Sequence, residues 1–293
     1  MQEKRRRRHG DRKEGRLLRT LDPYNTATPF IMKDRTDALV YFSDSIEITE
    51  AEKYLRRKRA EGMKGVGMLH LFTAAYVRTV SQRPALNRFV SGQRIYARNN
   101  IEYVMSVKKE MTSSGSETSI KVVFDPKDTM ADVYRKMDEQ IRQVKEGEAD
   151  TSTDRVAAVL MKMPRLLLRF AIGCIKFADY FGWLPTSLLN ASPFHGSIII
   201  TDLGSLGIPP VLHHIYNLGN LPIFLAIGTK RYANEIARDG SVQEKKYLDY
   251  TVVGDERICD GFYFAQSFRY LKSYMRHPEQ LDVPPEQVFE DVD

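Results

Sequence analysis

The sequence predicts an α/β fold, a two-layer sandwich in which helices pack on a mixed β-sheet. Three observations lead to this class. Runs rich in β-branched and aromatic residues alternate along the chain with helical patterns that carry an apolar stripe. Two continuous apolar runs, residues 196–202 and 221–228, are typical of buried strands. A last strand then passes through a charged loop into an amphipathic helix, so strands and helices are expected to share one core.

The first half of the chain supplies most of the predicted strands. After a strand over residues 38–48, Thr49 and Glu52 have the spacing of a capping box, and Gly62 ends the helix that they begin. Pro84 stops the next helix. The other elements that we expect here are a helix over 66–80, a hairpin over 89–96, and strands over 101–107 and 118–124.

The second half opens with a long helix after Asp128, followed by an apolar region, residues 150–190, that is interpreted as a helical insertion. This region contains Arg169, Lys176 and Asp179 and has no charge-free window of about 18 residues, so it is not expected to cross a bilayer. It could lie on a membrane surface or pack as a helical hairpin. We expect packing, because aromatic stripes at helical spacing usually belong to a core.

Turn residues and composition set the expected domain organisation. Asp239-Gly240 predicts a hairpin turn whose second strand runs to Gly254 and leads into the last helix. The expected parts are a disordered basic arm (1–20), one domain (21–280) with an insertion at about 150–190, and a loose acidic tail (281–293).

The positive charge is concentrated at the start of the chain. The net charge is +6, and the first 19 residues hold nine basic and three acidic side chains, so the rest of the chain is neutral overall. Such an arm is either a solvated terminus or a contact with anionic lipid or nucleic acid. The two cysteines, Cys174 and Cys259, predict no disulfide scaffold, and the histidines lack metal-ligand spacing. We therefore expect a cytoplasmic protein without a metal.

Two motifs stand on the predicted strands of the C-terminal half. Residues 200–204 read Ile-Thr-Asp-Leu-Gly, and residues 255–261 read Asp-Glu-Arg-Ile-Cys-Asp-Gly. In this order and separation they resemble the catalytic domain shared by chloramphenicol acetyltransferase and the dihydrolipoyl acyltransferase core of the 2-oxoacid dehydrogenase complexes. That family carries His-x-x-x-Asp-Gly near its C-terminus, and here Glu256 occupies the place of the histidine.

The resemblance implies a chloramphenicol acetyltransferase-like fold and acyl transfer between coenzyme A and a small-molecule thiol or hydroxyl acceptor. In the family the histidine takes the acceptor's proton, and a Ser or Thr hydroxyl binds the oxyanion. The site lies between subunits of a trimer. Carried over by position, Thr201 is the oxyanion donor and Asp260 the carboxylate that holds the loop through an arginine. Residues expected to support the two loops are Asp202, Gly204, Asp255, Arg257 and Gly261.

Glu256 decides which function the sequence predicts. A charged carboxylate about 4 Å from an anionic intermediate repels it by about 4 kcal/mol, which is on the order of a thousandfold in rate. We expect a stand-alone protein without a lipoyl domain that binds CoA or acyl-CoA and has lost most acyl transfer. The alternatives are a glutamate-based enzyme and a mixed trimer in which Thr201 serves a neighbour's histidine. His213 and His214 either replace the missing imidazole or are ordinary loop residues.

Overall fold

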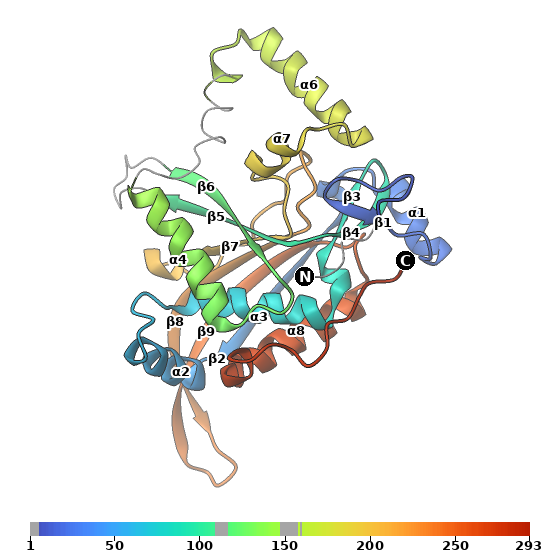
Figure 1. The fold of residues 1–293 in the computed structure, drawn as a ribbon. Helices are drawn as coiled ribbons and strands as arrows, with labels where there is room; N and C mark the ends of the chain where they lie inside the picture. Colours follow the sequence, from blue (N-terminus) through green and yellow to red (C-terminus); the bar gives the residue numbers. More distant parts are fainter. Residues whose placement is uncertain (1–5, 109–116, 147–157, 159) are drawn as a thin grey trace.

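A six-stranded mixed sheet forms the centre of the fold in the computed structural model, which describes residues 6–108, 117–146, 158 and 160–293 (Figure 1). The strand order is β2-β9-β8-β7-β5-β6; β7 runs parallel to both of its neighbours, and the other pairs are antiparallel. The predicted α/β class with a mixed sheet is confirmed. The strands are β2 (Leu39–Glu47), β5 (Ile101–Lys108), β6 (Glu117–Phe124), β7 (Ile198–Asp202), β8 (Ile223–Ile236) and β9 (Val242–Asp255).

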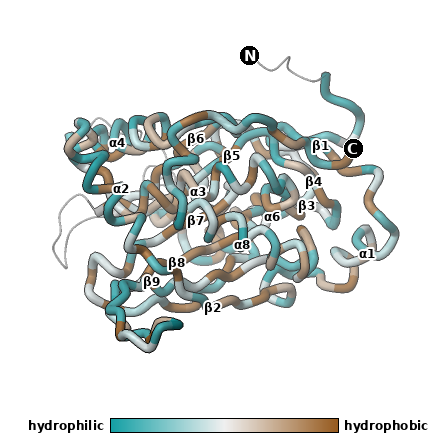
Figure 2. The backbone as a smooth tube through the Cα atoms, turned by 90° about the horizontal axis from the view of Figure 1, so that it is seen from below, coloured by the Kyte–Doolittle hydropathy of each residue, from teal (hydrophilic) through white to brown (hydrophobic). Residues whose placement is uncertain are grey.

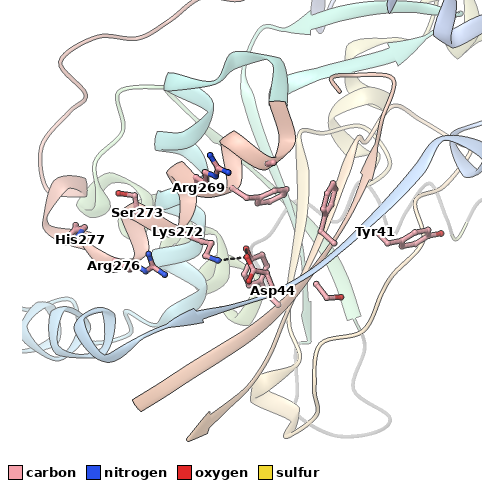
Figure 3. A pocket seen from close by; sticks show the side chains of 12 residues that line it. Tyr41, Asp44, Arg269, Lys272, Ser273, Arg276 and His277 are labelled. Atoms are coloured by element: carbon pink, nitrogen blue, oxygen red, sulfur yellow. Dashed lines mark hydrogen bonds and ion pairs between the residues drawn. The ribbon is translucent and has the colours of Figure 1, made fainter. Parts of the chain in front are cut away.

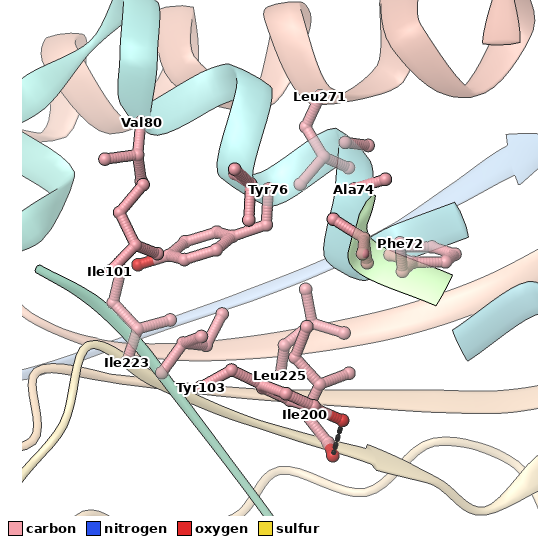
Figure 4. Packing of buried hydrophobic residues seen from close by; sticks show 14 of the residues in the cluster. Phe72, Ala74, Tyr76, Val80, Ile101, Tyr103, Ile200, Ile223, Leu225 and Leu271 are labelled. Atoms are coloured by element: carbon pink, nitrogen blue, oxygen red, sulfur yellow. Dashed lines mark hydrogen bonds between the residues drawn. The ribbon is translucent and has the colours of Figure 1, made fainter. Parts of the chain in front are cut away.

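Helices on one face of this sheet form the main core with it. Phe72, Tyr76 and Val80 recur every four residues in the central helix, and Figure 4 shows this helix above Ile200, Ile223 and Leu225 of the sheet. The central helix is buried on almost every side, because two other helices pack along it. The four helices of this layer are α2 (Thr49–Ala60), α3 (Met68–Gln82), α4 (Met130–Glu146) and α8 (Gly261–Arg276).

The opposite face of the sheet is covered by the connection between β7 and β8. Ile215 of this connection packs on Phe224 and Val253 in a small second cluster. The Thr251 hydroxyl donates a hydrogen bond to the carbonyl oxygen of Val211 (2.6 Å), which ties the connection to β9. The connection also leaves apolar side chains on the surface, namely those of Leu206, Ile208, Val211, Leu212 and Tyr216.

A second, three-stranded sheet joins the start of the chain to the predicted hairpin. β1 (Gly15–Leu17) pairs with β4 (Arg94–Arg98), which pairs with β3 (Arg88–Ser91). The hairpin turns at Gly92 and Gln93, whose φ angles of 57° and 56° are typical of a type I′ turn. Between β1 and β2 the chain forms α1 (Pro23–Ile31), a helix that was not predicted from the sequence.

The described part of the arm and the C-terminal tail are bound to each other. The backbone N–H groups of Arg19 and Thr20 donate to the carbonyl oxygen of Asp293 at 2.7 and 2.6 Å. Arg88 donates to both carboxylate oxygens of Asp291 at 2.6 Å. Figure 2 shows the C-terminal end of the chain beside β1. We expected a disordered arm and a loose tail. Instead, residues 6–20 and the tail bond to each other, the arm pairs with β4 through β1, and the tail binds Arg88 of β3.

The apolar region after α4 differs from our expectation. α6 (Arg165–Phe181) and α7 (Thr186–Ala191) form two helices, but most side chains of α6 are exposed, and the helix stands away from the sheet (Figure 1). The predicted packing as a core hairpin is therefore wrong for α6. Within the described residues, no helix is both long enough and apolar enough to cross a membrane.

The start of α2 also differs from the predicted capping box. Ile48 is the N-cap, and Thr49 is already the first helical residue. Glu52 does not bond back to the N-cap; its carboxylate accepts from Lys230 (2.5 Å) and Lys246 (3.0 Å) on the β8–β9 hairpin. The spacing fits a capping box, but two cations from distant strands offer the carboxylate stronger, charge-assisted bonds.

A buried histidine in α3 predicts that the protein loses stability in mild acid. Burial lowers the pKa of His70 to about 4, although the nearby Asp138 carboxylate acts in the opposite direction. The Nδ1 atom of His70 accepts a hydrogen bond from the Gly67 N–H, and its Nε2 has no partner among the described residues. The unfolded chain binds the proton near pH 6.5 and the folded chain only near pH 4, so stability falls as the pH drops through this window.

At pH 5 this effect lowers the free energy of unfolding by about 2 kcal/mol relative to pH 7. Urea unfolding at pH 7 and pH 5 measures it, with His70→Asn as the control, because an amide oxygen can still accept from Gly67. The wild type should lose about 2 kcal/mol more than the variant between the two pH values. An equal loss in both proteins would exclude His70 as the cause.

Candidate functional site

The loop that joins β9 to α8, residues 255–261, is held by a buried carboxylate between two arginines. Asp255 is fully buried and accepts from Arg257 Nε (2.8 Å) and Nη2 (2.7 Å), and from Arg35 Nε (3.3 Å). Arg257 also donates to the carbonyl oxygens of Met32 and Lys33 (2.8 and 3.2 Å). These bonds fix the loop against the segment that precedes β2.

Arg35 links this loop to two other parts of the site. Burial lowers the pKa of Arg35, and the Asp255 carboxylate acts in the opposite direction. The Nη1 group of Arg35 donates to the carbonyl oxygen of Tyr216 (2.7 Å) in the β7–β8 connection, and its Nη2 group donates to the carbonyl oxygen of Val90 (3.3 Å) in β3. Sequence reasoning missed Arg35, because nothing in its local sequence points to a partner 220 positions away.

Glu256 lies at the surface of this fixed loop. Its backbone N–H donates to the carbonyl oxygen of Ala38 (2.9 Å), which extends the β2–β9 pairing by one residue. Its carboxylate is exposed and has no hydrogen bond or ion pair with any other described residue. The backbone of Glu256 is therefore positioned, while its side chain is available to a ligand or a neighbouring subunit.

Asp260 and Cys259 have local roles in the same loop. The Asp260 side chain accepts from the Tyr263 N–H (2.7 Å) and caps α8, which begins at Gly261. We expected Asp260 to hold the loop through an arginine; in the described part of the chain that contact belongs to Asp255 instead. Burial raises the pKa of the Cys259 thiol, so this cysteine stays protonated and is not an activated nucleophile.

Thr201 lies near the C-terminal end of β7, on the face covered by the β7–β8 connection. It pairs with Ala226, which pairs with Thr251, so the three residues form a row across the sheet. Asp202 accepts from the Ser205 N–H (3.2 Å) and shapes the turn after the strand. A side chain at Gly204 would clash with the carbonyl oxygen of Gly228, which explains the glycine in this motif.

The two motifs do not meet within one chain. Glu256 follows Thr251 by five positions, about 16 Å along an extended strand, and Thr201 lies two strands from Thr251, about 10 Å across the sheet. The Cα atoms of Thr201 and Glu256 are therefore roughly 19 Å apart. A site that uses both residues needs two copies of the chain or two different chains.

The two loop histidines lie over the sheet face that α8 does not cover. His213 stacks on Phe224 with ring centroids 4.1 Å apart, and burial lowers its pKa. His214 contacts the edge of Tyr216 and is exposed. Val253, beneath this cluster, alternates along β9 with Gly254, which packs under Phe264 of α8. The histidines and the α8 side of the loop thus belong to opposite faces of the sheet.

A pocket of about 690 Å³ opens between β2 and α8 (Figure 3). Phe42 and Tyr250 give it an apolar floor, and α8 contributes a basic rim. Tyr41 stands at its edge, and its side chain points away from α8 (Figure 3). Lys272 of the rim is paired with Asp44 (2.7 Å). Arg269 and Arg276 are exposed and have no ion pair among the described residues. Their spacing of seven on a helix was a signal for a shared face, which sequence reasoning missed.

Comparisons with known proteins relate this fold to acyltransferase cores. The sequence matches no protein-family model and no curated protein. A probable dihydrolipoamide acetyltransferase from Listeria monocytogenes 4b F2365 has a similar structure, with a TM-score of 0.58, 13% identity, and coverage of 92% of this chain and 97% of that one. The cubic core of the pyruvate dehydrogenase multienzyme complex gives 0.58, 14% identity and 88% of each chain.

A third similar structure is the Azotobacter vinelandii dihydrolipoamide acetyltransferase, which was studied for the role of a serine, a histidine and an asparagine in its catalytic mechanism. Its TM-score is 0.57, with 14% identity over 83% of each chain. At such identities the comparisons show a common fold, and the predicted acyltransferase fold is confirmed.

Proposed function

We propose that this chain binds coenzyme A thioesters and has lost most acyl-transfer activity, so that it acts as a pseudoenzyme on an acyltransferase fold. The observation that carries the proposal is Glu256, which stands where the family signature has its histidine and is exposed without a partner. The Azotobacter vinelandii enzyme has its histidine and asparagine four positions apart, as are Glu256 and Asp260 here. This equal spacing supports the proposal that the loop corresponds to the family's catalytic loop, with Glu256 in place of its base.

The pocket between β2 and α8 is the proposed place for coenzyme A. It begins at Tyr41, three residues along β2 from Ala38, which bonds the backbone of Glu256; this is about 10 Å from the loop. Coenzyme A has a long pantetheine arm, with methylene and methyl groups between its amides, and this arm is joined to phosphates. The apolar floor suits the arm, and the unpaired guanidinium groups of Arg269 and Arg276 suit the phosphates.

Calorimetric titration with coenzyme A tests the binding half of the proposal. Arg269→Gln combined with Arg276→Gln should weaken coenzyme A binding by about tenfold or more, because two charge-assisted bonds to phosphate are lost. Pantetheine, which lacks the phosphates, should bind the variant and the wild type equally. Arg238→Gln is the matched control, an exposed arginine at the β8–β9 turn without an ion pair in the described structure. No binding of coenzyme A to the wild type would contradict the proposal.

Release of free coenzyme A from acetyl-CoA, with a panel of thiol and hydroxyl acceptors, tests the catalytic half. The wild type is expected to show little turnover above the uncatalysed rate. Turnover that is abolished by Glu256→Gln and by Thr201→Ala would instead establish a glutamate-based acyltransferase.

A mixed oligomer is a second candidate function, and the separation of the two motifs favours it. Thr201 and Glu256 are roughly 19 Å apart in one chain, so Thr201 can serve only a neighbour's loop. A cubic core, as in the pyruvate dehydrogenase complex, contains threefold axes, and the exposed apolar side chains of the β7–β8 connection provide a surface for such a contact. This chain would then form homotrimers, or mixed trimers with a histidine-bearing relative. Native mass spectrometry of co-expressed chains distinguishes the two, and a monomer would contradict both.

A further inference from the structure

Helix α6 has an apolar stripe that no other described part of the chain covers. Leu166, Phe170 and Phe177 are 82%, 70% and 58% exposed, and the stripe continues to Phe181. Figure 1 shows α6 apart from the sheet and from the helices that pack on it. A contiguous exposed apolar surface of this kind marks an interaction site.

A row of basic residues runs beside this stripe. At 100° per residue, Arg165, Arg169 and Lys176 lie within an arc of about 40°, whose centre is about 110° from the centre of the apolar stripe. The helix therefore has an apolar face flanked by positive charge. Helices that lie in the surface of a membrane combine these two features, because acyl chains take the apolar face and anionic headgroups take the cations.

The negative charge of α6 is kept inside the protein. Asp179 is its one acidic residue; it is buried, and its carboxylate lies 3.3 Å from Nε2 of His195. Arg12 donates to the carbonyl oxygens of Asp179 and Tyr180 (both 2.6 Å), which fixes the C-terminal end of the helix to the body. The exposed surface of α6 thus carries no acidic side chain.

The fixed end of the helix carries an exposed aromatic cluster. Phe177 and Phe181 contact each other with ring centroids 4.9 Å apart, and Trp183 lies 5.8 and 5.1 Å from these two rings. Trp183 is 65% exposed. Tryptophan is enriched at the boundary between acyl chains and headgroups, since its ring is apolar and its N–H needs a polar partner.

We propose that α6 lies in the surface of a membrane that contains anionic phospholipid. The apolar stripe enters the acyl boundary, the row of Arg165, Arg169 and Lys176 contacts the headgroups, and Arg12 couples the helix to the rest of the chain. A second copy of the chain could cover an apolar stripe, but it would not account for a flanking row of cations that form no ion pair with any described residue. Binding to the membrane does not depend on whether the site at Glu256 is active.

Trp183 is the only tryptophan in the sequence, so its fluorescence reports this surface directly. With vesicles that contain phosphatidylglycerol, its emission should move to shorter wavelength, brominated acyl chains should quench it, and the protein should sediment with the lipid. Vesicles of phosphatidylcholine alone should give little binding, and added salt should weaken the binding to anionic vesicles.

Two sets of variants identify the residues responsible. Arg165→Gln, Arg169→Gln and Lys176→Gln together should weaken binding on the order of 100-fold, at about fivefold per cation. Phe170→Ser with Phe177→Ser should abolish the fluorescence shift. Ile236→Ser with Val242→Ser, at equally exposed positions of the β8–β9 hairpin, is the matched control and should change nothing. Circular dichroism checks that each variant is folded.

Three results would overturn the proposal. Trp183 emission that does not respond to anionic vesicles excludes lipid contact. A shift that appears with rising protein concentration in the absence of lipid assigns the stripe to a second copy of the chain. Binding that is lost in Arg6→Gln with Arg7→Gln but kept when Phe170 and Phe177 are replaced assigns the contact to the arm rather than to α6.

Discussion

Glu256→His is expected to raise acyl transfer from acetyl-CoA by about a thousandfold over the wild type. A carboxylate about 4 Å from the anionic intermediate opposes it by about 4 kcal/mol, whereas a neutral imidazole takes the acceptor's proton and becomes a cation beside the anion. The loop should tolerate the change, because the side chain of Glu256 is exposed and its backbone bond to Ala38 does not involve it. Release of coenzyme A, resolved by chromatography over a panel of acceptors, measures the gain.

Two controls separate catalysis from a general effect of charge. Glu256→Gln removes the charge without supplying a base and should give no comparable gain. Adding Thr201→Ala to Glu256→His should reduce the new activity by about 100-fold, the usual loss when one oxyanion donor is removed. If Glu256→His stays inactive while it binds coenzyme A normally, the loop is not an acyl-transfer site.

Asp255→Asn is expected to lower the free energy of unfolding by about 3–5 kcal/mol. The carboxylate is fully buried and is the shared acceptor of Arg35 and Arg257. The amide keeps the shape but removes the charge and turns N–H groups toward a guanidinium, which leaves two buried cations uncompensated. Guanidinium chloride unfolding at pH 7 and a fixed protein concentration measures the loss.

Asp249→Asn is the matched control for this change. Asp249 stands on the same strand and pairs with Arg231 (2.8 Å), but both side chains are partly exposed to solvent. Solvent screens such a pair, so its loss should cost at most about 1 kcal/mol. Equal losses in the two variants would show that the buried cluster around Asp255 does not stabilise the fold more than a surface pair does.

Most of the fold could be predicted because it depends on local patterns. Alternation and continuous apolar runs locate the strands of the large sheet, and Asp239-Gly240 locates the hairpin, where Gly240 has a φ of 83°. β1 was missed because three residues, one of them the charged Arg16, do not show a strand period; pairing with β4 makes Gly15–Leu17 a strand. The exposure of α6 could not be predicted from the sequence either, because periodicity reveals an apolar stripe but not what covers it.

The candidate site could be predicted only as far as its motifs extend. The spacing from Glu256 to Gly261 and the glycine at 204 are local features of the sequence. In the structure this loop leads into α8 at Gly261, and Gly204 packs against the carbonyl oxygen of Gly228. Which carboxylate of the loop binds arginine is not a local feature. Asp255 and Asp260 look equivalent in the sequence, and the choice depends on Arg35, which approaches from the other end of the chain.

The pairing of β2 with β9 also has a consequence for how the protein is made. Ser43 lies opposite Thr251, so an edge strand from the first fifth of the chain has its partner about 200 residues later. At ribosomal rates of about 5–20 residues per second, β2 waits roughly 10 to 40 s for β9 to emerge. During that time its backbone edge and its apolar face are both open to other nascent chains, which makes early chaperone contact with this segment important for the yield of folded protein.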